Sequence, residues 1–266
     1  MTILIDSINS LICLYVERSI CICNPITKEF AMLPDSKGKS NNRYSFKSMS
    51  NSNRYRFVYV SSTNEYKVVG IYPSKTTGFV KVRIFTLGSG SGWRNLGKVN
   101  SEFSSYTWTS PGVFANGALY WVDAVFDKIA IFDLAEEKFC EKKLPPPPDL
   151  YWKYSIIGDK NVSFCLSVPG DELYDLWILK NMKDGESLVW SKEGRFADND
   201  DHELLTLRKS ERVIGYSPYY LSSCSIKTPI WKHLLEFKDD GVQVCLHKNT
   251  LVSLKELGKA DKTVMQ

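Results

Sequence analysis

The histidines and cysteines of this 266-residue sequence are its most reactive side chains. A protein metal site draws such ligands from short, regular spacings. His202, His233 and His247 each stand apart, and Cys21 and Cys23 alternate along one expected strand without a third ligand nearby. We therefore expect no bound metal and no cofactor.

Two loops resemble ligand-binding motifs in part. Residues 38–40 (Gly-Lys-Ser) end like a phosphate-binding loop, but Leu33 stands where that loop needs its first Gly. Residues 198–202 (Asp-Asn-Asp-Asp-His) lack the Gly and the final Glu of a calcium loop, which favours a solvated acidic tip. A Ser/His/Asp triad assembles only in space, so it stays open, but no Gly-x-Ser-x-Gly motif points to one. We predict that the chain is not an enzyme.

Charge is nearly balanced, with 34 Lys and Arg against 30 Asp and Glu, for a net charge of +4. The one loose basic tract contains Lys37, Lys39 and Arg43. A nucleic-acid-binding domain concentrates its basic residues on one face, so we expect no nucleic-acid partner. No apolar run reaches the roughly eighteen residues that a membrane-spanning helix needs, so we expect no membrane partner.

The seven cysteines are odd in number and irregular in spacing, which does not suit a disulfide framework. Most lie in apolar runs, as Cys13, Cys165 and Cys245 do, where a thiol behaves as a small buried hydrophobe. The sequence predicts reduced, mostly buried thiols. Such thiols are typical of the reducing cytoplasm or nucleus, which is the location we expect.

Short apolar runs separated by turn residues dominate the chain and predict many short strands. The abundance of rings (14 Tyr, 13 Phe and 7 Trp) favours strands as well. In the stretch 113–144, Asn116-Gly117 between two apolar runs predicts a tight hairpin. The runs 129–132 and 138–143 add two strands, which makes a four-stranded antiparallel meander with Trp121 inside the sheet stack.

Parts of this meander recur along the chain. Similar alternating strands open at residues 20, 82, 129, 176 and 242, each followed by a polar turn and a further strand. A period in the forties with about four strands is typical of a propeller blade. We predict a single all-β domain over 1–266, with its core from about 7 to 256, built as a kelch-like, propeller-like array of antiparallel four-stranded sheets in five or six blades. The stretch Pro229–Phe237 fits a helix or a strand.

Several aromatic residues fall in or beside the predicted loops. Tyr and Trp are frequent anchors of protein–protein interfaces. We therefore regard six residues as candidates for partner binding, with capping of blade edges as the alternative: Tyr106, Trp108, Tyr151, Trp152, Tyr219 and Tyr220.

A series of motifs follows in one order from residue 7 to about 256. They are Leu11-Ile-Cys-Leu-Tyr15, Asn24-Pro25-Ile-Thr-Lys-Glu-Phe30 with Leu33-Pro34, Tyr59 to Val69 with its Tyr66-Lys67-Val68-Val69, Val82-Arg-Ile-Phe85 with Trp93-Arg94, Asn116-Gly-Ala-Leu-Tyr-Trp121, Ile131-Phe-Asp-Leu134 and Leu144-Pro145. In this order and spacing the sequence resembles the plant F-box-associated interaction domain.

That resemblance implies target recognition within a Skp–cullin–F-box ubiquitin ligase, in which an F-box docks on the Skp adaptor and the associated domain holds a protein target. No F-box precedes residue 7, and the family's opening Ser-Cys-Asn-Gly-Leu is replaced by Ser7-Ile-Asn-Ser-Leu11. We expect Skp adaptor and cullin as partners only where an F-box is supplied upstream. The alternative is a stand-alone propeller that serves as a scaffold or as a decoy, and an enzyme ranks third. The family implies no catalytic residues.

Overall fold

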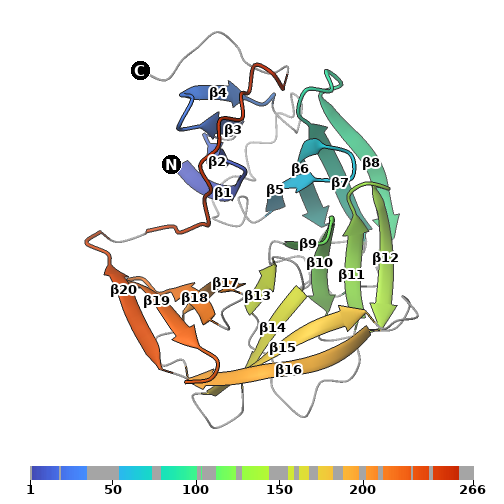
Figure 1. Cartoon of the computed structure of the whole chain (residues 1–266). Coiled ribbons are helices and arrows are strands. Elements are labelled where there is room, and N and C mark those ends of the chain that lie inside the picture. Colours follow the sequence, from blue (N-terminus) through green and yellow to red (C-terminus); the bar gives the residue numbers. More distant parts are fainter. Residues whose placement is uncertain are drawn as a thin grey trace. The chain divides into compact units, whose positions relative to one another are not determined.

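The computed structural model describes residues 2–17, 19–34, 54–73, 79–100, 103, 112–123, 128–143, 155–158, 162–167, 173–181, 188–197, 202–208, 212–228, 230–239 and 242–257. Within these ranges the regular secondary structure is entirely β. Twenty strands form five four-stranded sheets, and each sheet runs through its strands in chain order (Figure 1).

The pairings are antiparallel and follow chain order, so each sheet is a meander. The first sheet contains β1 (Thr2–Ile8), β2 (Leu11–Val16), β3 (Ser19–Asn24) and β4 (Glu29–Met32). The second contains β5 (Tyr55–Val60), β6 (Glu65–Pro73), β7 (Phe79–Thr86) and β8 (Trp93–Asn100). The third contains β9 (Val113–Ala115), β10 (Ala118–Asp123), β11 (Lys128–Asp133) and β12 (Lys138–Lys143).

The remaining two sheets repeat the same order. The fourth contains β13 (Ser155–Gly158), β14 (Val162–Ser167), β15 (Leu173–Asn181) and β16 (Leu188–Ala197). The fifth contains β17 (Glu203–Arg208), β18 (Arg212–Tyr216), β19 (Tyr220–Ser225) and β20 (Trp231–Glu236). Repeated four-stranded antiparallel sheets are the blades of a β-propeller, which confirms the predicted fold class.

The chain divides into two compact units. One contains Met1–Gly112, Leu134–Lys138 and Cys245–Gln266, and the other contains Val113–Asp133 and Phe139–Val244. The expectation of a single domain over 1–266 stays a prediction.

The hairpin predicted from Asn116-Gly117 is present between β9 and β10. Asn116 has φ 48° and Gly117 has φ 77°, the left-handed pair that a two-residue turn between twisted strands requires. β11 and β12 complete the predicted meander, and Trp121 on β10 is buried as expected.

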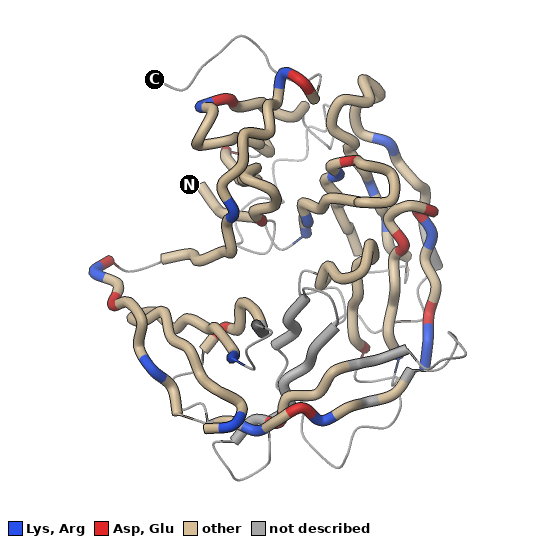
Figure 2. The backbone as a smooth tube through the Cα atoms, in the orientation of Figure 1, with Lys and Arg blue, Asp and Glu red and all other residues tan. Residues whose placement is uncertain are grey.

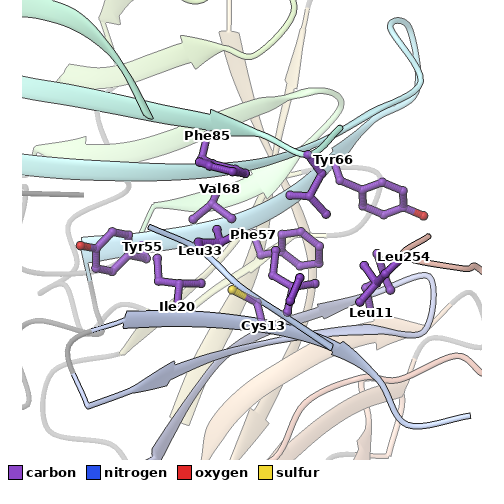
Figure 3. Close-up of a cluster of buried hydrophobic side chains, with 13 residues drawn as sticks. Leu11, Cys13, Ile20, Leu33, Tyr55, Phe57, Tyr66, Val68, Phe85 and Leu254 are labelled. Atoms are coloured by element: carbon purple, nitrogen blue, oxygen red, sulfur yellow. The ribbon is translucent and has the colours of Figure 1, made fainter. Parts of the chain in front are cut away.

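Aromatic rings fill the core of the first unit. The cluster joins side chains of the first sheet, such as Leu11 and Ile20, to Tyr55, Phe57 and Phe85 of the second sheet (Figure 3). The ring centroids of Tyr55 and Trp93 lie 6.2 Å apart, and those of Phe85 and Trp93 lie 5.5 Å apart. Each sheet thereby buries a face that it cannot cover by itself.

The last quarter of the chain differs from the sequence-based expectation at one strand and decides between two alternatives at another. The strand predicted to open the last repeat at residue 242 is wrong: residues 242–250 pair with no strand, and the third strand of the fifth sheet is β19. Alternation misled us because β19 buries Ser222 and Ser223, so its inward faces are not marked by apolar residues. The stretch Pro229–Phe237, which fitted either element, holds strand β20.

The described cysteines form no disulfides with one another, and their reduced state stays a prediction. Cys13, Cys21, Cys23 and Cys224 are buried, Cys245 is partly buried and Cys140 on β12 is exposed. The side chain of Cys165 lies outside the described residues.

Candidate protein-binding surface on the fifth sheet

The three histidines lie in separate environments. The His202 ring stacks on Trp231 with centroids 4.0 Å apart, and the His233 ring stacks on Tyr220 at 4.1 Å. His247 Nδ1 shares a hydrogen bond with Ser7 Oγ at 2.7 Å, and the described contacts of His247 include no carboxylate that would complete a triad. Among the described residues, no group of three His, Cys, Asp or Glu side chains is placed to hold a metal ion.

Among the described residues of the first unit, Lys67 on β6 is a buried charge, with 3% of its side chain exposed. Its Nζ donates to the Leu134 carbonyl oxygen at 2.8 Å and to Glu137 Oε1 at 3.0 Å. Arg94 on β8 donates to both oxygens of Glu137. Burial raises the pKa of Glu137, but the hydrogen bonds from Arg94 and Lys67 outweigh burial and lower it overall. These contacts tie the turn 134–137 to the second sheet.

A second buried charge lies on the fourth sheet. Asp175 on β15 is buried and accepts hydrogen bonds from Lys192 Nζ and from Arg195 Nε, each at 2.5 Å. Burial raises the pKa of Asp175, but these hydrogen bonds and charges from β16 lower it overall. The partly buried Glu137 and the buried Asp175 are thus both held by cationic partners.

The turn between β18 and β19 is different, because it presents an aromatic side chain to solvent. Ser217 N–H donates to the Tyr220 carbonyl oxygen at 2.9 Å, and Tyr220 N–H donates to Ser217 Oγ at 3.3 Å. Pro218 follows Ser217, at the position where a fixed φ favours a β-turn. The Phe237 N–H after β20 donates to the Tyr219 carbonyl oxygen at 2.7 Å. The Tyr219 backbone is thus held from two directions while 62% of the residue is exposed.

Strand β20 extends this exposure along the edge of the fifth sheet. Ser222 pairs with His233 and Leu221 pairs with Leu235, so Leu234 is the extra residue of a bulge. Leu234 is exposed, and Leu235 is 56% exposed. We call Tyr219, Tyr220, His233, Leu234 and Leu235 the hairpin surface.

The hairpin surface carries little charge. Lys and Arg are interspersed with Asp and Glu along the described backbone (Figure 2). On the hairpin itself, Lys232 precedes the exposed leucines and Glu236 follows them. Rigid rings and exposed leucines flanked by charges suit contact with another protein rather than bond making, because the contact region of a protein interface is apolar and its rim is polar.

Of the six aromatic residues singled out from the sequence, the structure describes two. Tyr219 and Tyr220 lie next to each other at the turn, the first exposed and the second partly covered by His233. Tyr106, Trp108, Tyr151 and Trp152 lie outside the described residues. A binding role for any of the six stays a prediction.

Sequence reasoning missed His233, Leu234 and Leu235. A signal was present, because consecutive leucines in a strand of period two cannot both face the same core. The signal went unused since the same residues also fitted one turn of a helix.

Repeated four-stranded sheets with an exposed aromatic and aliphatic edge define a β-propeller suited to protein contact. Comparison of sequences names the family within that class: the F-box associated beta propeller domain matches residues 1–213, and the chain belongs to this family. A search of curated proteins found no match. Among the part of the chain that the structure describes, no helix is long and apolar enough to cross a membrane.

Solved structures with a similar fold share little sequence with this chain. One is a chain in the crystal structure of a mitotic checkpoint complex, with 9% identity and a TM-score of 0.42, covering 92% of this chain and 79% of that one. Another is the Cps50 (Swd1) beta-propeller domain of Myceliophteria thermophila, with 11% identity and a TM-score of 0.42; the match covers 93% of this chain and 92% of that one. A third is Kluyveromyces lactis Hsv2p, with 10% identity and a TM-score of 0.39; the match covers 87% of this chain and 61% of that one.

Proposed function

We propose that this chain captures a protein target through its hairpin surface and, where an F-box accompanies it, presents that target to a Skp–cullin–F-box ubiquitin ligase. The carrying observation is Tyr219, which is held by backbone hydrogen bonds on both sides and exposed beside two leucines. Membership of the F-box associated family supports the ligase context. The free thiols support action in the cytoplasm or nucleus.

The hairpin surface should lose little conformational entropy when it binds a partner. A side chain that binds a partner loses conformational freedom, and this loss is smallest for a Tyr or Trp that is already fixed at its backbone. Tyr219 lies in a turn in which Ser217 and Tyr220 are hydrogen-bonded to each other, and Tyr220 is stacked on His233. The hairpin surface is therefore preorganised for contact.

The test is a pull-down from a cell extract with the wild-type chain and with Tyr219→Ala/Leu235→Asp as bait, with bound proteins identified by mass spectrometry. Met32→Asp is the matched control, because Met32 is 50% exposed on β4, the outer strand of the first sheet. We expect one or more proteins to be retained by the wild type and by Met32→Asp and to be lost from the hairpin variant. If all three baits retain the same proteins while the hairpin variant melts normally, the hairpin surface is not the binding site.

The ligase context is tested separately. The captured target, the full-length protein and purified Skp adaptor, cullin and ubiquitin-transfer enzymes are combined, and ubiquitin addition to the target is followed. Transfer that depends on Tyr219 supports delivery. Capture without transfer points to the scaffold or decoy instead.

A further inference from the structure

The C-terminal residues 245–257, here called the strap, cross the end of the first sheet where the β1–β2 and β3–β4 turns meet. In a four-stranded meander these two turns fall at the same end of the sheet. The first turn is Asn9-Ser10, both with positive φ, and the second begins at Asn24, whose Oδ1 accepts the Ile26 N–H at 2.9 Å. These two turns and Glu29 form the strap site.

The strap site contacts mostly the backbone of the strap. Asn24 Nδ2 donates to the Val252 carbonyl oxygen at 2.7 Å and to the Thr250 carbonyl oxygen at 3.4 Å. Ser10 Oγ donates to the Lys248 carbonyl oxygen at 2.5 Å and also accepts the Thr250 N–H.

Glu29 binds the far end of the strap. One of its carboxylate oxygens accepts the Leu254 N–H at 2.7 Å, and the other accepts Ser253 Oγ at 3.0 Å. The contacted residues 248, 250 and 252 alternate, which is the spacing of an extended chain. The strap then enters a turn, because the Leu257 N–H donates to the Ser253 carbonyl oxygen at 3.2 Å.

One side chain of the strap fills a pocket. Leu254 is fully buried in the aromatic cluster of the first unit, where it lies beside Leu11 (Figure 3). Leu251, three residues earlier, is 79% exposed. The end of the strap lies against the β7–β8 loop, since a methyl group at Gly88 would overlap the Leu257 carbonyl oxygen. Contacts to the backbone with one apolar anchor are the usual chemistry of extended-peptide recognition.

The first sheet does not depend on the strap for its own hydrogen bonds. The pairings β1–β2, β2–β3 and β3–β4 are complete without it, and residues 242–253 join no sheet. Leu254 is the one strap residue among the thirteen buried side chains of the cluster, and Val252 and Leu257 pack against the cluster while only partly buried. A segment attached by side chains, with few buried apolar contacts, belongs to the low-stability end of a protein's local openings.

We propose that the strap site is a recognition site for an extended peptide and that the strap is its resident ligand, bound in cis and able to leave without unfolding the first sheet. Covalent linkage keeps the strap bound, because a tethered segment acts at an effective concentration on the order of millimolar. The kind of partner that fits is a segment that is extended at the positions of residues 248–252 and then turns, with Leu at the position of Leu254. The proposal is independent of the hairpin surface, which involves none of these residues.

Peptide binding to the full-length chain tests the proposal. Leu254→Asp should expel the strap, and Leu251→Asp is the matched control because Leu251 lies on the same strap in solvent. The probe is a fluorescent peptide with the sequence of residues 246–257, and the same peptide with Leu254→Asp is its control. We expect the probe to bind the Leu254→Asp chain at least about tenfold more tightly than the wild type or Leu251→Asp, in which the tethered strap competes. Adding Asn24→Ala to the Leu254→Asp chain should weaken the probe by roughly tenfold to thirtyfold, the factor for two ordinary hydrogen bonds.

Hydrogen exchange of the wild-type chain supplies a measurement that needs no variant. The amides of Thr250 and Leu254 should exchange through a local opening, faster than the amides of β2 and β3. Exchange of these strap amides at the rate of the slowest sheet amides would overturn the proposal, as would a folded Leu254→Asp chain that fails to bind the probe. If light scattering finds dimers that exchange their straps, the resident ligand comes from a second copy and the cis assignment is wrong.

Discussion

Removing Glu137 tests the interpretation that the Lys67 cluster stabilises the fold. In Glu137→Ala, the Lys67 ammonium stays buried and keeps the Leu134 carbonyl oxygen at 2.8 Å and Glu65 Oε2 at 3.3 Å. Glu65 is substantially exposed, so its compensation is weak. Breaking a buried pair from one side costs about 3–5 kcal/mol, and we expect the lower end, about 3 kcal/mol. For a chain of this size that corresponds to a fall in Tm of roughly 6–12 °C.

Two further variants remove the Lys67 charge itself, and so separate the cost of an unpaired charge from the cost of losing Glu137. Lys67→Met keeps the volume of the side chain and leaves Glu137 paired with Arg94. Its expected cost is about 1–2 kcal/mol, chiefly for the Leu134 carbonyl oxygen that loses its donor. Because the double variant Lys67→Met/Glu137→Ala no longer buries an unpaired ammonium, it should be more stable than Glu137→Ala. Urea unfolding at pH 7, followed by tryptophan fluorescence, gives the three free energies. A double variant no more stable than Glu137→Ala would refute the reasoning, since buried charge would then not be the source of the loss.

Three further predictions concern the core, the thiols and the strap. Trp121→Ala should cost about 3–5 kcal/mol, measured by the same unfolding experiment, because Trp121 is buried with the Phe139 ring centroid 6.2 Å from its own; a loss below about 1 kcal/mol would contradict its place in the core. A thiol reagent should modify Cys140 first in the folded chain; mass spectrometry would count against this order if it found earlier modification of a buried thiol, namely Cys13, Cys21, Cys23 or Cys224. Burial raises the pKa of Glu29, but the Leu254 N–H and the Ser253 and Thr27 hydroxyls lower it overall, below the ordinary 4.5. Its contribution to strap binding is therefore complete above about pH 4.5 and is lost as the pH falls through the lower pKa of the folded state. The protection of the Leu254 amide, which is its exchange rate relative to an unstructured amide at the same pH, should then fall in the wild type more than in Glu29→Gln.

Where local chemistry fixes the backbone, the sequence was sufficient to predict the turns and strands. Asn116-Gly117 predicted its hairpin because few residue pairs accept positive φ at both positions, and the alternating runs on either side predicted the strands. Repetition of that pattern was enough for the fold class, since one four-stranded sheet cannot bury both of its faces. The motifs from Asn24 to Trp121 were enough for the family.

The sites were less accessible to sequence reasoning. Tyr219 was singled out from the sequence as a candidate for partner binding, a role that stays a prediction, and the structure exposes 62% of it. The leucines beside it depend on the register of β19 against β20, and a bulge shifts that register at Leu234. A bulge inserts one residue and changes which side chains share a face, and period-two counting does not foresee it.

What the sequence by itself determined is the repeated strand-and-turn pattern, because φ preferences and apolar alternation act between neighbours in the chain. What the tertiary structure decided is which distant polar groups meet. Asn24 and Glu29 appear in the sequence as an ordinary turn before a strand, yet they hold the backbone of Thr250 to Leu254, more than two hundred residues further on. Lys67, which stands in an apolar run, is buried because Glu137 and the Leu134 carbonyl oxygen satisfy its charge. Hydrogen-bond partners this far apart in the sequence are brought together by the packing of sheets against turns, and no local sequence pattern predicts them.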